Sequence, residues 1–502
     1  MFRRTFITFV LALALTGRSG TPFALAQQLE GVLSYHNAPD RSGHFIVPGL
    51  TAERARGLHL DTGFHAQVSG HVYAQPLFWR GGGASAGMLL VATEDNIVHA
   101  LDGGDGHELW RRTLGPPVAR AALGCGNISP LGITGTPVID AAHETLYVSA
   151  AVNEEGRVHH RVFALSLKDG AVQPGWPVDV AAALRAHVQT FNARDQNQRG
   201  ALTILDGTLY VPFGGHFGDC GDYHGWVVGI SLGDPRSVSS FVTRGRGGGI
   251  WAPGGIASAD GALFVATGNT FGASRWSDGE AVFRVPRALK HSNETRDFFA
   301  PPDWRALDER DADLGGSNPL PLAVPDASGT RPLLLALGKD SRAYVLDRNN
   351  LGGIGGSLIA ETVSIGPIRT APATYRIGSA IYVAFQGRGA HCPSGSAGGG
   401  LTVLKLTAGS SPSLTTAWCG ALRGAGSPIV TTTDGGANPI VWILGAEGDE
   451  RLHGFNGETG DVVFNGRSRA ETMTGLRHFQ TLIATDSRLY VAADGRVYAF
   501  AF

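Results

Sequence analysis

The chain has 502 residues, of which 43% are hydrophobic and 17% are charged, so its composition indicates a buried core and excludes a disordered chain. Glycine contributes 72 residues, roughly twice its usual share, without the every-third-residue period of collagen, which favours many tight turns between short strands. The 41 basic and 43 acidic residues leave a net charge of -2 and form no basic run, which argues against nucleic acid as a partner.

Residues 1–26 have the pattern of an export signal peptide. Arg3-Arg4 precedes an apolar stretch from Phe6 to Leu15, and Ala24-Leu25-Ala26 offers a small-residue cleavage site. The two arginines also resemble a twin-arginine signal, so both export routes stay open. The apolar stretch is too short to cross a membrane, and no later run of about 18 uncharged apolar residues appears. We therefore expect a periplasmic or secreted protein without a transmembrane segment.

Four cysteines fit an oxidising compartment and allow three pairings. We expect Cys125 to pair with Cys220 and Cys392 with Cys419, because the second pair brackets a single hairpin-like stretch. The sequence holds no Cys-x-x-Cys-His motif for covalent haem, and no Cys-x-x-Cys or His-x-x-x-His pair that would support a zinc site.

One pattern recurs eight times along the chain: alternating apolar residues, a small residue, and then a turn that carries Asp, Asn or Gly. Its clearest copy is the segment VHALDGGDGHELW at residues 98–110. Two strand signals precede each copy, namely an alternating run such as residues 145–149 and a Gly/Pro-rich opening such as residues 135–139. The small residues of the eight copies stand at positions 100, 164, 229, 284, 345, 403, 454 and 499.

Units of about fifty to sixty residues with four strand signals are typical of propeller blades. The sequence therefore predicts an all-β fold, an eight-bladed β-propeller of four-stranded antiparallel blades over residues 61–502, after an irregular lead-in at 27–60. The chain ends just after the eighth third-strand signal, so residues within 60–80 should supply the outer strand of that blade. Seven blades is the alternative, because the copies at 284 and 403 are degenerate. A parallel β-helix is disfavoured because its coils are shorter.

The repeat has a known counterpart. Ala100-x-Asp102-x-x-x-Gly106-x-x-x-Trp110 resembles the tryptophan-docking repeat of the quinoprotein alcohol dehydrogenase superfamily, and residues 454–464 are a weaker copy. In that repeat the Trp packs over the next blade, which is a structural role and implies the fold without implying an activity. Non-catalytic members with the same repeat serve as scaffolds for outer-membrane assembly.

In the catalytic members, pyrroloquinoline quinone (PQQ) lies on the propeller axis, stacked on a Trp and bound to Ca²⁺. The resemblance implies that Trp251 is the stacking residue and that Glu155 and Asn269 bind the metal. It further implies that Asp313 is the catalytic base and a metal ligand, and that Lys339 is the nearby cation. Trp251 and Asn269 are 18 residues apart, which is similar to the spacing of their counterparts.

The chemistry suits these residue types. Ca²⁺ takes carboxylate and amide oxygens. Lys339 would stabilise negative charge on a quinone oxygen, Asp313 would take the alcohol proton, and Trp251 offers a flat apolar face. Each residue also has a structural interpretation: Asn269 as a turn residue, Glu155 as a surface acid, Trp251 as core, and Lys339 as the partner of a neighbouring aspartate.

The sequence departs from the family at two positions. Catalytic members carry two adjacent cysteines that cover the second face of PQQ, whereas the corresponding loop here reads Gly124-Cys125-Gly126 with a single Cys. The Trp next to the catalytic Asp is replaced by Ala312. These departures leave open a propeller without catalytic activity.

Further polar residues stand where strands should meet the axis. Arg199, Arg369 and Arg477 would suit an anion such as a PQQ carboxylate or an acidic sugar. The alternative interpretation is ordinary hydrogen bonding between blades. The loop 214–226 contains two His and two Asp that could bind a metal, although its glycines and Cys220 favour a loop held by a disulfide.

The sequence thus predicts an exported quinoprotein-like oxidoreductase that uses PQQ and Ca²⁺. Its substrate would be a small-molecule alcohol or sugar. Because the chain has no haem motif, its electrons would pass to an external electron acceptor. The alternative is a non-catalytic propeller of the same type that acts as a binding or scaffold module in the cell envelope.

Overall fold

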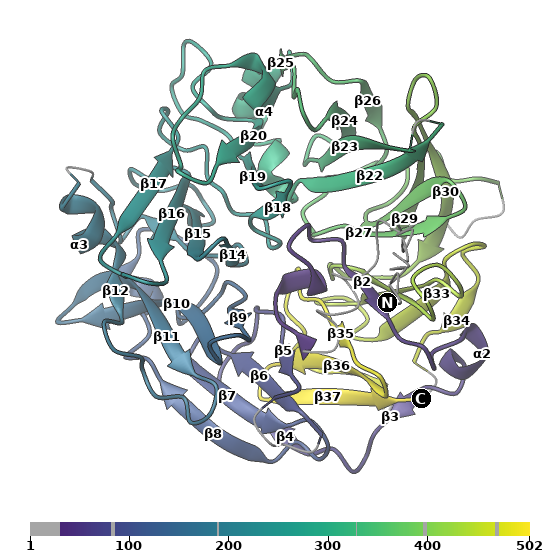
Figure 1. Ribbon diagram of the computed structural model, residues 1–502, viewed down its shortest axis with the longest axis horizontal. Coiled ribbons are helices and arrows are strands. Elements are labelled where there is room, and N and C mark those ends of the chain that lie inside the picture. Colours follow the sequence, from purple (N-terminus) through teal and green to yellow (C-terminus); the bar gives the residue numbers. More distant parts are fainter. Residues whose placement is uncertain (1–30, 82–85, 188–189, 328, 395–398, 467–470) are drawn as a thin grey trace, which may run out of the picture.

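A computed structural model describes residues 31–81, 86–187, 190–327, 329–394, 399–466 and 471–502. The predicted export signal, residues 1–26, lies outside the described residues. Eight mainly antiparallel sheets of four or five strands stand in a ring around a central axis (Figure 1). The prediction of an eight-bladed β-propeller is therefore confirmed, and the seven-bladed alternative is wrong.

The blades follow one another in chain order, each built mainly from consecutive strands. Blades 1 to 4 consist of β5 (Leu77–Trp79), β6 (Met88–Ala92), β7 (Ile97–Asp102) and β8 (Glu108–Thr113); β9 (Val138–Asp140), β10 (Thr145–Glu154), β11 (Arg157–Ser166) and β12 (Val178–Asp179); β13 (Gln196–Asn197), β14 (Thr203–Leu205), β15 (Thr208–Gly215), β16 (Trp226–Ser231) and β17 (Val238–Val242); and β18 (Ala257–Ala259), β19 (Ala262–Thr267), β20 (Ala281–Pro286), β21 (Phe298–Ala300) and β25 (Gly353–Ile354).

Blades 5 to 8 have the same plan. They consist of β22 (Leu320–Asp326), β23 (Gly329–Leu337), β24 (Arg342–Asp347) and β26 (Ile359–Thr362); β27 (Ala373–Ile377), β28 (Ala380–Gln386), β29 (Gly400–Thr407) and β30 (Ser413–Ala421); β31 (Ile429–Thr432), β32 (Ile440–Leu444), β33 (Leu452–Asn456) and β34 (Val462–Phe464); and β35 (Ile483–Ala484), β36 (Arg488–Ala493) and β37 (Arg496–Ala501).

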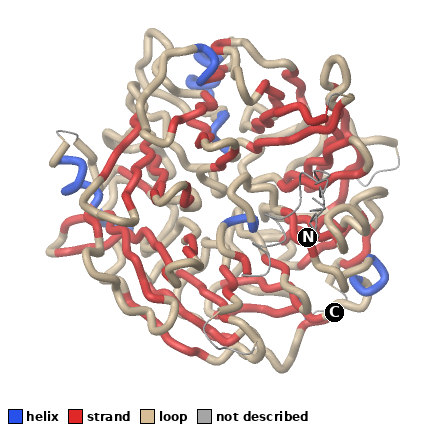
Figure 2. The backbone as a smooth tube through the Cα atoms, viewed as in Figure 1, coloured by secondary structure: helices blue, strands red, loops and turns tan. Residues whose placement is uncertain are grey.

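Helices are few and short, and they lie in connections between strands (Figure 2). None of the described helices is both long and apolar enough to cross a membrane. The described helices are η1 (Tyr35–Asn37), α2 (Ala52–Ala55), η2 (Arg120–Ala122), α3 (Val180–Arg185), η3 (Thr295–Asp297), α4 (Trp304–Arg310) and η4 (Leu314–Gly316).

The N-terminal segment of the described chain joins several blades. β1 (Gly31–Val32) pairs with β5, and β2 (His44–Ile46) runs parallel to β31. β3 (His59–Leu60) and β4 (Ala66–Gln67) pair antiparallel with β37, so blade 8 takes its outer strand from the beginning of the chain (Figure 1). The ring is thus closed by backbone hydrogen bonds between the two ends of the chain, which removes the exposed edge that blade 8 would otherwise present.

Tryptophans at blade edges fasten neighbouring blades together. The indole of Trp110 on β8 donates a hydrogen bond to the carbonyl of Leu167 in blade 2 at 3.0 Å, and its ring lies against Gly170. Trp418 on β30 repeats the arrangement, because its indole donates to the carbonyl of Gly457 in blade 7 at 2.9 Å. The repeat that identifies the fold in the sequence therefore has a packing role.

The two disulfides are those predicted, Cys125–Cys220 and Cys392–Cys419. The first joins the connection between blades 1 and 2 to the β15–β16 loop of blade 3, and the second lies within blade 6.

The propeller has two faces. One face, here called the upper face, carries the loops between the second and third strands of each blade and the connections between blades. Turns between first and second strands and between third and fourth strands share the opposite, lower face.

Candidate functional site

Four of the residues singled out in the sequence come together on the upper face. Trp251 precedes β18, Asn269 follows β19, Asp313 precedes η4, and Lys339 lies between β23 and β24. Asp313 Oδ1 accepts a hydrogen bond from the backbone N–H of Asn269 at 2.8 Å. Lys339 Nζ lies 2.5 Å from Asp313 Oδ2 and 5.3 Å from the centre of the Trp251 ring. These four residues are called the Asp313 cluster below.

Two glycines allow this close approach. A Cβ atom on Gly268 would stand 2.9 Å from Asp313 Oδ1 and 3.1 Å from the Trp251 indole nitrogen. A Cβ on Gly316 would stand 2.7 Å from the carbonyl oxygen of Ile368. At each position the Cβ atom would come within 3 Å of an oxygen atom that cannot easily move away. Glycine at these two positions therefore lets the loops of blades 4 and 5 meet.

The ion pair within the cluster is shielded from water. Asp313 is 3% exposed, and burial raises the pKa of its carboxyl group while the nearby Lys339 opposes that shift. Burial also acts to lower the pKa of Lys339, but the charges of Asp313 and Asp311 raise it above its ordinary value. Asp311 Oδ1 lies 2.5 Å from the same Nζ atom. The lysine therefore carries its charge and is held between two carboxylates.

Glu280 is a further carboxyl group of this site, and sequence reasoning missed it. Its side chain is fully buried, and Oε2 accepts a hydrogen bond from the backbone N–H of Leu314 at 2.6 Å. Oε1 has no hydrogen-bond partner within the part of the chain that the structure describes. Burial first, and then the charge of Asp313, raises the pKa of Glu280 well above its ordinary value. The available signal was an acidic residue immediately before the apolar third strand of blade 4.

The loop between β15 and β16 contributes a tyrosine. Tyr223 is buried and donates a hydrogen bond from its hydroxyl to Asp219 Oδ1 at 2.6 Å. Burial raises the pKa of Tyr223, and the charges of Asp219 and Asp313 raise it further. Tyr223 therefore stays neutral within electrostatic range of Asp313. The disulfide at Cys220 holds this loop beside the site.

The same loop does not gather its histidines around a metal. His216 Nε2 lies 3.0 Å from the carbonyl of Arg194, and His224 Nδ1 lies 2.9 Å from the carbonyl of Thr243. Among the described residues, three acidic or histidine side chains bring their ligand atoms within 4.8 Å of one another only on the turn that carries Asp102, Asp105 and His107. The interpretation of the loop as held by a disulfide is the one that agrees with its contacts.

Glu155 lies apart from the cluster. It occupies the turn between β10 and β11 with a positive φ of 50°, and its side chain is exposed. A Cβ atom on the following Gly156 would meet nothing within 4 Å, so the turn is open to solvent. Among the described residues, no hydrogen bond or ion pair joins Glu155 to Trp251 or Asp313.

The three arginines have different environments. Arg199 lies 4.6 Å over the ring of Phe479, and its Nη2 atom is buried without a hydrogen-bond partner among the described residues. Burial lowers the pKa of Arg199 to about 10. Arg477 is paired with Asp494, and Arg369 is exposed. Arg199 is therefore the arginine whose unpaired, buried donor suits an anion.

The residues present fit PQQ and a cation by their donor chemistry. Asp313, Glu280 and Asn269 offer the carboxylate and amide oxygens that Ca²⁺ prefers, and the Asn269 carboxamide has no hydrogen-bond partner among the described residues. Trp251 is only half-buried, so part of its ring is accessible. The unpaired Nη2 of Arg199 suits a carboxylate.

The structure has the fold of the PQQ-type dehydrogenase propellers. It is similar to the quinohemoprotein alcohol dehydrogenase from Comamonas testosteroni, with a TM-score of 0.67 and 14% identity over 96% of this chain and 82% of that one. A quinohemoprotein alcohol dehydrogenase from Pseudomonas putida HK5 gives a TM-score of 0.64 at 14% identity over 95% and 81% of the two chains. A europium-containing methanol dehydrogenase gives 0.64 at 13% identity over 94% and 98%.

At these identities the likeness shows the fold alone. No protein-family profile matches the sequence. No curated protein matches it either. An activity must therefore be argued from the site itself.

Proposed function

We propose that the protein is an exported quinoprotein-like oxidoreductase that oxidises an alcohol or a sugar with PQQ and Ca²⁺ at the propeller axis. The observation that carries the proposal is the buried ion pair of Asp313 and Lys339 beside Trp251 and Asn269. The titles of the similar structures name alcohol and methanol dehydrogenases, which supports this class of substrate. The two disulfides are consistent with export.

Each residue of the site has a role in the proposal. When bound, PQQ would supply the two-electron acceptor for the substrate carbon. Asp313 accepts the proton of the substrate hydroxyl, and the N–H of Asn269 and the ammonium of Lys339 hold its carboxylate in place. Lys339 also supplies the positive charge that favours reduction next to it.

The remaining residues bind and orient. Trp251 provides the apolar face, and Arg199 with its unpaired donor would bind a carboxylate, with Arg369 and Arg477 as further candidates. Asn269 and Asp313 would hold the cation, and the resemblance adds Glu155 as a third ligand. Glu280 is a second candidate for that role, because its carboxyl group is buried and interacts electrostatically with Asp313.

Reconstitution tests the proposal. Purified protein incubated with PQQ and Ca²⁺ should acquire the absorbance of the cofactor and reduce an artificial dye in the presence of an alcohol or a sugar. Because one similar structure is a europium-containing dehydrogenase, Eu³⁺ is the second metal to test. If PQQ does not co-elute with either metal, the proposal fails.

Substitutions separate the roles within the site. Asp313→Asn should lower turnover by about 10²-fold or more and retain PQQ, because the base is lost while the cofactor's contacts remain. Asn269→Ala should raise the Ca²⁺ concentration needed for half-maximal activity. Glu155→Gln and Glu280→Gln, compared in the same titration, identify the third ligand as the residue whose substitution raises that concentration. Full turnover in Asp313→Asn would contradict the assignment.

The alternative, a non-catalytic binding or scaffold module of the cell envelope, also has an observation in its favour. Lys339 Nζ stands over the Trp251 ring, so one face of that ring already has a partner within the protein. The failure of PQQ to bind, together with an unchanged fold, would favour this alternative.

A further inference from the structure

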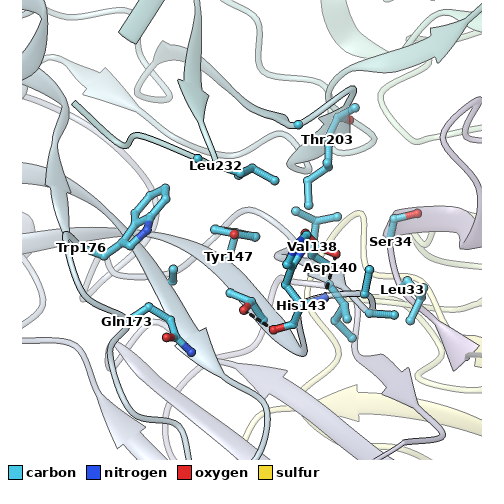
Figure 3. A pocket seen from close by; sticks show the side chains of 18 of the residues that line it. Leu33, Ser34, Val138, Asp140, His143, Tyr147, Gln173, Trp176, Thr203 and Leu232 are labelled. Atoms are coloured by element: carbon cyan, nitrogen blue, oxygen red, sulfur yellow. Dashed lines mark hydrogen bonds and ion pairs between the residues drawn. The ribbon is translucent and has the colours of Figure 1, made fainter. Parts of the chain in front are cut away.

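A large cleft opens on the lower face, between blades 2 and 3 and away from the Asp313 cluster. Its volume is about 920 Å³, which lies in the range of small-molecule sites. The turn between β9 and β10, the segments that follow β11 and β16, the turn between β14 and β15, and the N-terminal segment near Leu33 line it (Figure 3). The cleft therefore assembles from five separate stretches of the chain.

Two aromatic side chains shape the cleft. The rings of Trp176 and Tyr147 have centroids 5.3 Å apart and planes inclined at 58°. In Figure 3, Trp176 and Gln173 lie at one end of the cleft, Leu33 and Ser34 at the other, and Tyr147 between them. Such rings offer flat apolar faces together with polar edges to a ligand.

The polar groups of these side chains are not used by the protein. The indole N–H of Trp176, the hydroxyl of Tyr147 and the carboxamide of Gln173 have no hydrogen-bond partner among the described residues. Ser34 Oγ is buried and has none either. Burial raises the pKa of Tyr147 to about 12, so its hydroxyl remains a neutral donor. Polar groups without a protein partner on the wall of a cleft are available to a ligand that can pair with them.

The charged side chains that line the cleft already have partners within the protein. Asp140 Oδ2 lies 2.8 Å from His143 Nδ1. Arg41 is fully buried, and its guanidinium donates to the carbonyls of Tyr35, Leu202 and Ile256. The cleft therefore presents no free cation that would select an anionic ligand.

We propose that this cleft binds a neutral oligosaccharide. A sugar ring combines an apolar C–H face for Trp176 and Tyr147 with hydroxyls that can pair with the unused donors and acceptors. A purely apolar ligand would leave those groups unpaired, and an anionic one would meet no free cation. Because the cleft lies on the face opposite the Asp313 cluster, this inference stands independently of the proposed function.

Calorimetric titration of the full-length protein without cofactor tests the inference. The probes are maltohexaose, cellohexaose and xylohexaose, with hexagalacturonate as the charged comparison. At least one neutral hexamer should bind, and hexagalacturonate should bind more weakly. Trp176→Ala should weaken binding about tenfold or more. Tyr147→Phe should weaken it severalfold, and this variant should fold normally because the hydroxyl has no hydrogen-bond partner in the described part of the chain.

Val172→Ala is the matched control, because Val172 is exposed next to Gln173 but does not line the cleft. It should bind like the unaltered protein. Binding by none of the three neutral hexamers overturns the inference. So does binding that both Trp176→Ala and Tyr147→Phe leave unchanged, or hexagalacturonate that binds as tightly as the neutral probes. PQQ reconstitution should be the same in all these variants, which keeps this test separate from that of the proposed function.

Discussion

At the scale of single residues, two buried carboxyl groups on the upper face differ in whether a cation is paired with them. Asp313 has the ammonium of Lys339 at 2.5 Å. Among the residues that the structure describes, Glu94 has no cation in contact. It accepts hydrogen bonds from the N–H of Gly132 at 2.6 Å and from the hydroxyl of Thr134 at 2.7 Å. Burial raises the pKa of Glu94 to about 7. The folded protein therefore holds this carboxyl group protonated over a pH range in which the unfolded chain ionises it.

Stability should depend on pH through Glu94. Because its pKa is raised on folding, its contribution is complete below the unfolded value of 4.5 and is lost as the pH rises through about 7. The loss amounts to about 3 kcal/mol in the free energy of unfolding. Glu94→Gln should remove this pH-dependent loss, because glutamine does not ionise. In urea unfolding, the stability of the variant relative to the unaltered protein should therefore increase from pH 5 to pH 8.

Comparing the two proteins at each pH isolates Glu94 from the buried histidines His36, His44 and His160. Burial lowers the pKa values of these histidines, so they act in the opposite direction over part of the same range. A stability difference between the two proteins that does not change from pH 5 to pH 8 would contradict the prediction.

At the scale of elements, blade-to-blade contacts depend on a glycine beneath each docked tryptophan. Gly170 has a φ of +67°, and a Cβ there would lie 2.6 Å from the Trp110 ring. Gly460 has a φ of +79° and would bring a Cβ to 2.9 Å from the Trp418 ring. Glycine is required at both positions for two reasons: the backbone is left-handed, and the tryptophan ring approaches too closely for a side chain.

Gly170→Ala should therefore destabilise the protein more than the same change in a turn with free space. Gly261 is the matched control, because its φ is +72° and a Cβ there would meet nothing within 4 Å. Both variants should lose about 1–2 kcal/mol for the left-handed conformation. Gly170→Ala should lose about 1–3 kcal/mol more for displacing Trp110. Equal losses in chemical unfolding would show that the Trp110 contact contributes little.

At the scale of the whole molecule, the N-terminal segment fastens distant blades. β1 pairs with blade 1, β2 with blade 7, and β3 and β4 with blade 8. Between them, Arg41 donates to the carbonyl of Leu202 at 2.8 Å and to that of Ile256 at 3.1 Å, which joins the segment to blades 3 and 4. Burial lowers the pKa of Arg41 to about 10, which still leaves it charged near neutral pH.

Arg41→Met should lower the free energy of unfolding by about 3 kcal/mol, because buried carbonyls would lose their donor. Arg41→Lys should not restore it, because an ammonium group cannot reproduce the planar fork that reaches several acceptors at once. Arg56→Met is the control, since Arg56 is exposed. A thermal midpoint in Arg41→Met equal to that of the control would show that this segment does not hold the ring together.

The sequence by itself determined the architecture, because the evidence for it is local and periodic. Among the three possible disulfide pairings it favoured the observed one, because Cys392 and Cys419 bracket a single hairpin-like stretch. Alternating apolar residues, small residues and turns recur with each blade, and a strand signal needs only its neighbours to be recognised. Trp251, Asn269, Asp313 and Lys339 were found through motif order, which also selected Glu155.

Only the tertiary structure decided which of these residues meet. Glu155 and Glu280 are both acidic residues beside strands in the sequence. In the structure Glu155 lies in an exposed hairpin turn, whereas Glu280 is buried within electrostatic range of Asp313. The cleft on the lower face has no signal in the sequence, because its lining comes from five separate segments. The physical reason is that burial and charge pairing depend on distances between loops of different blades, and these distances are set when the ring closes.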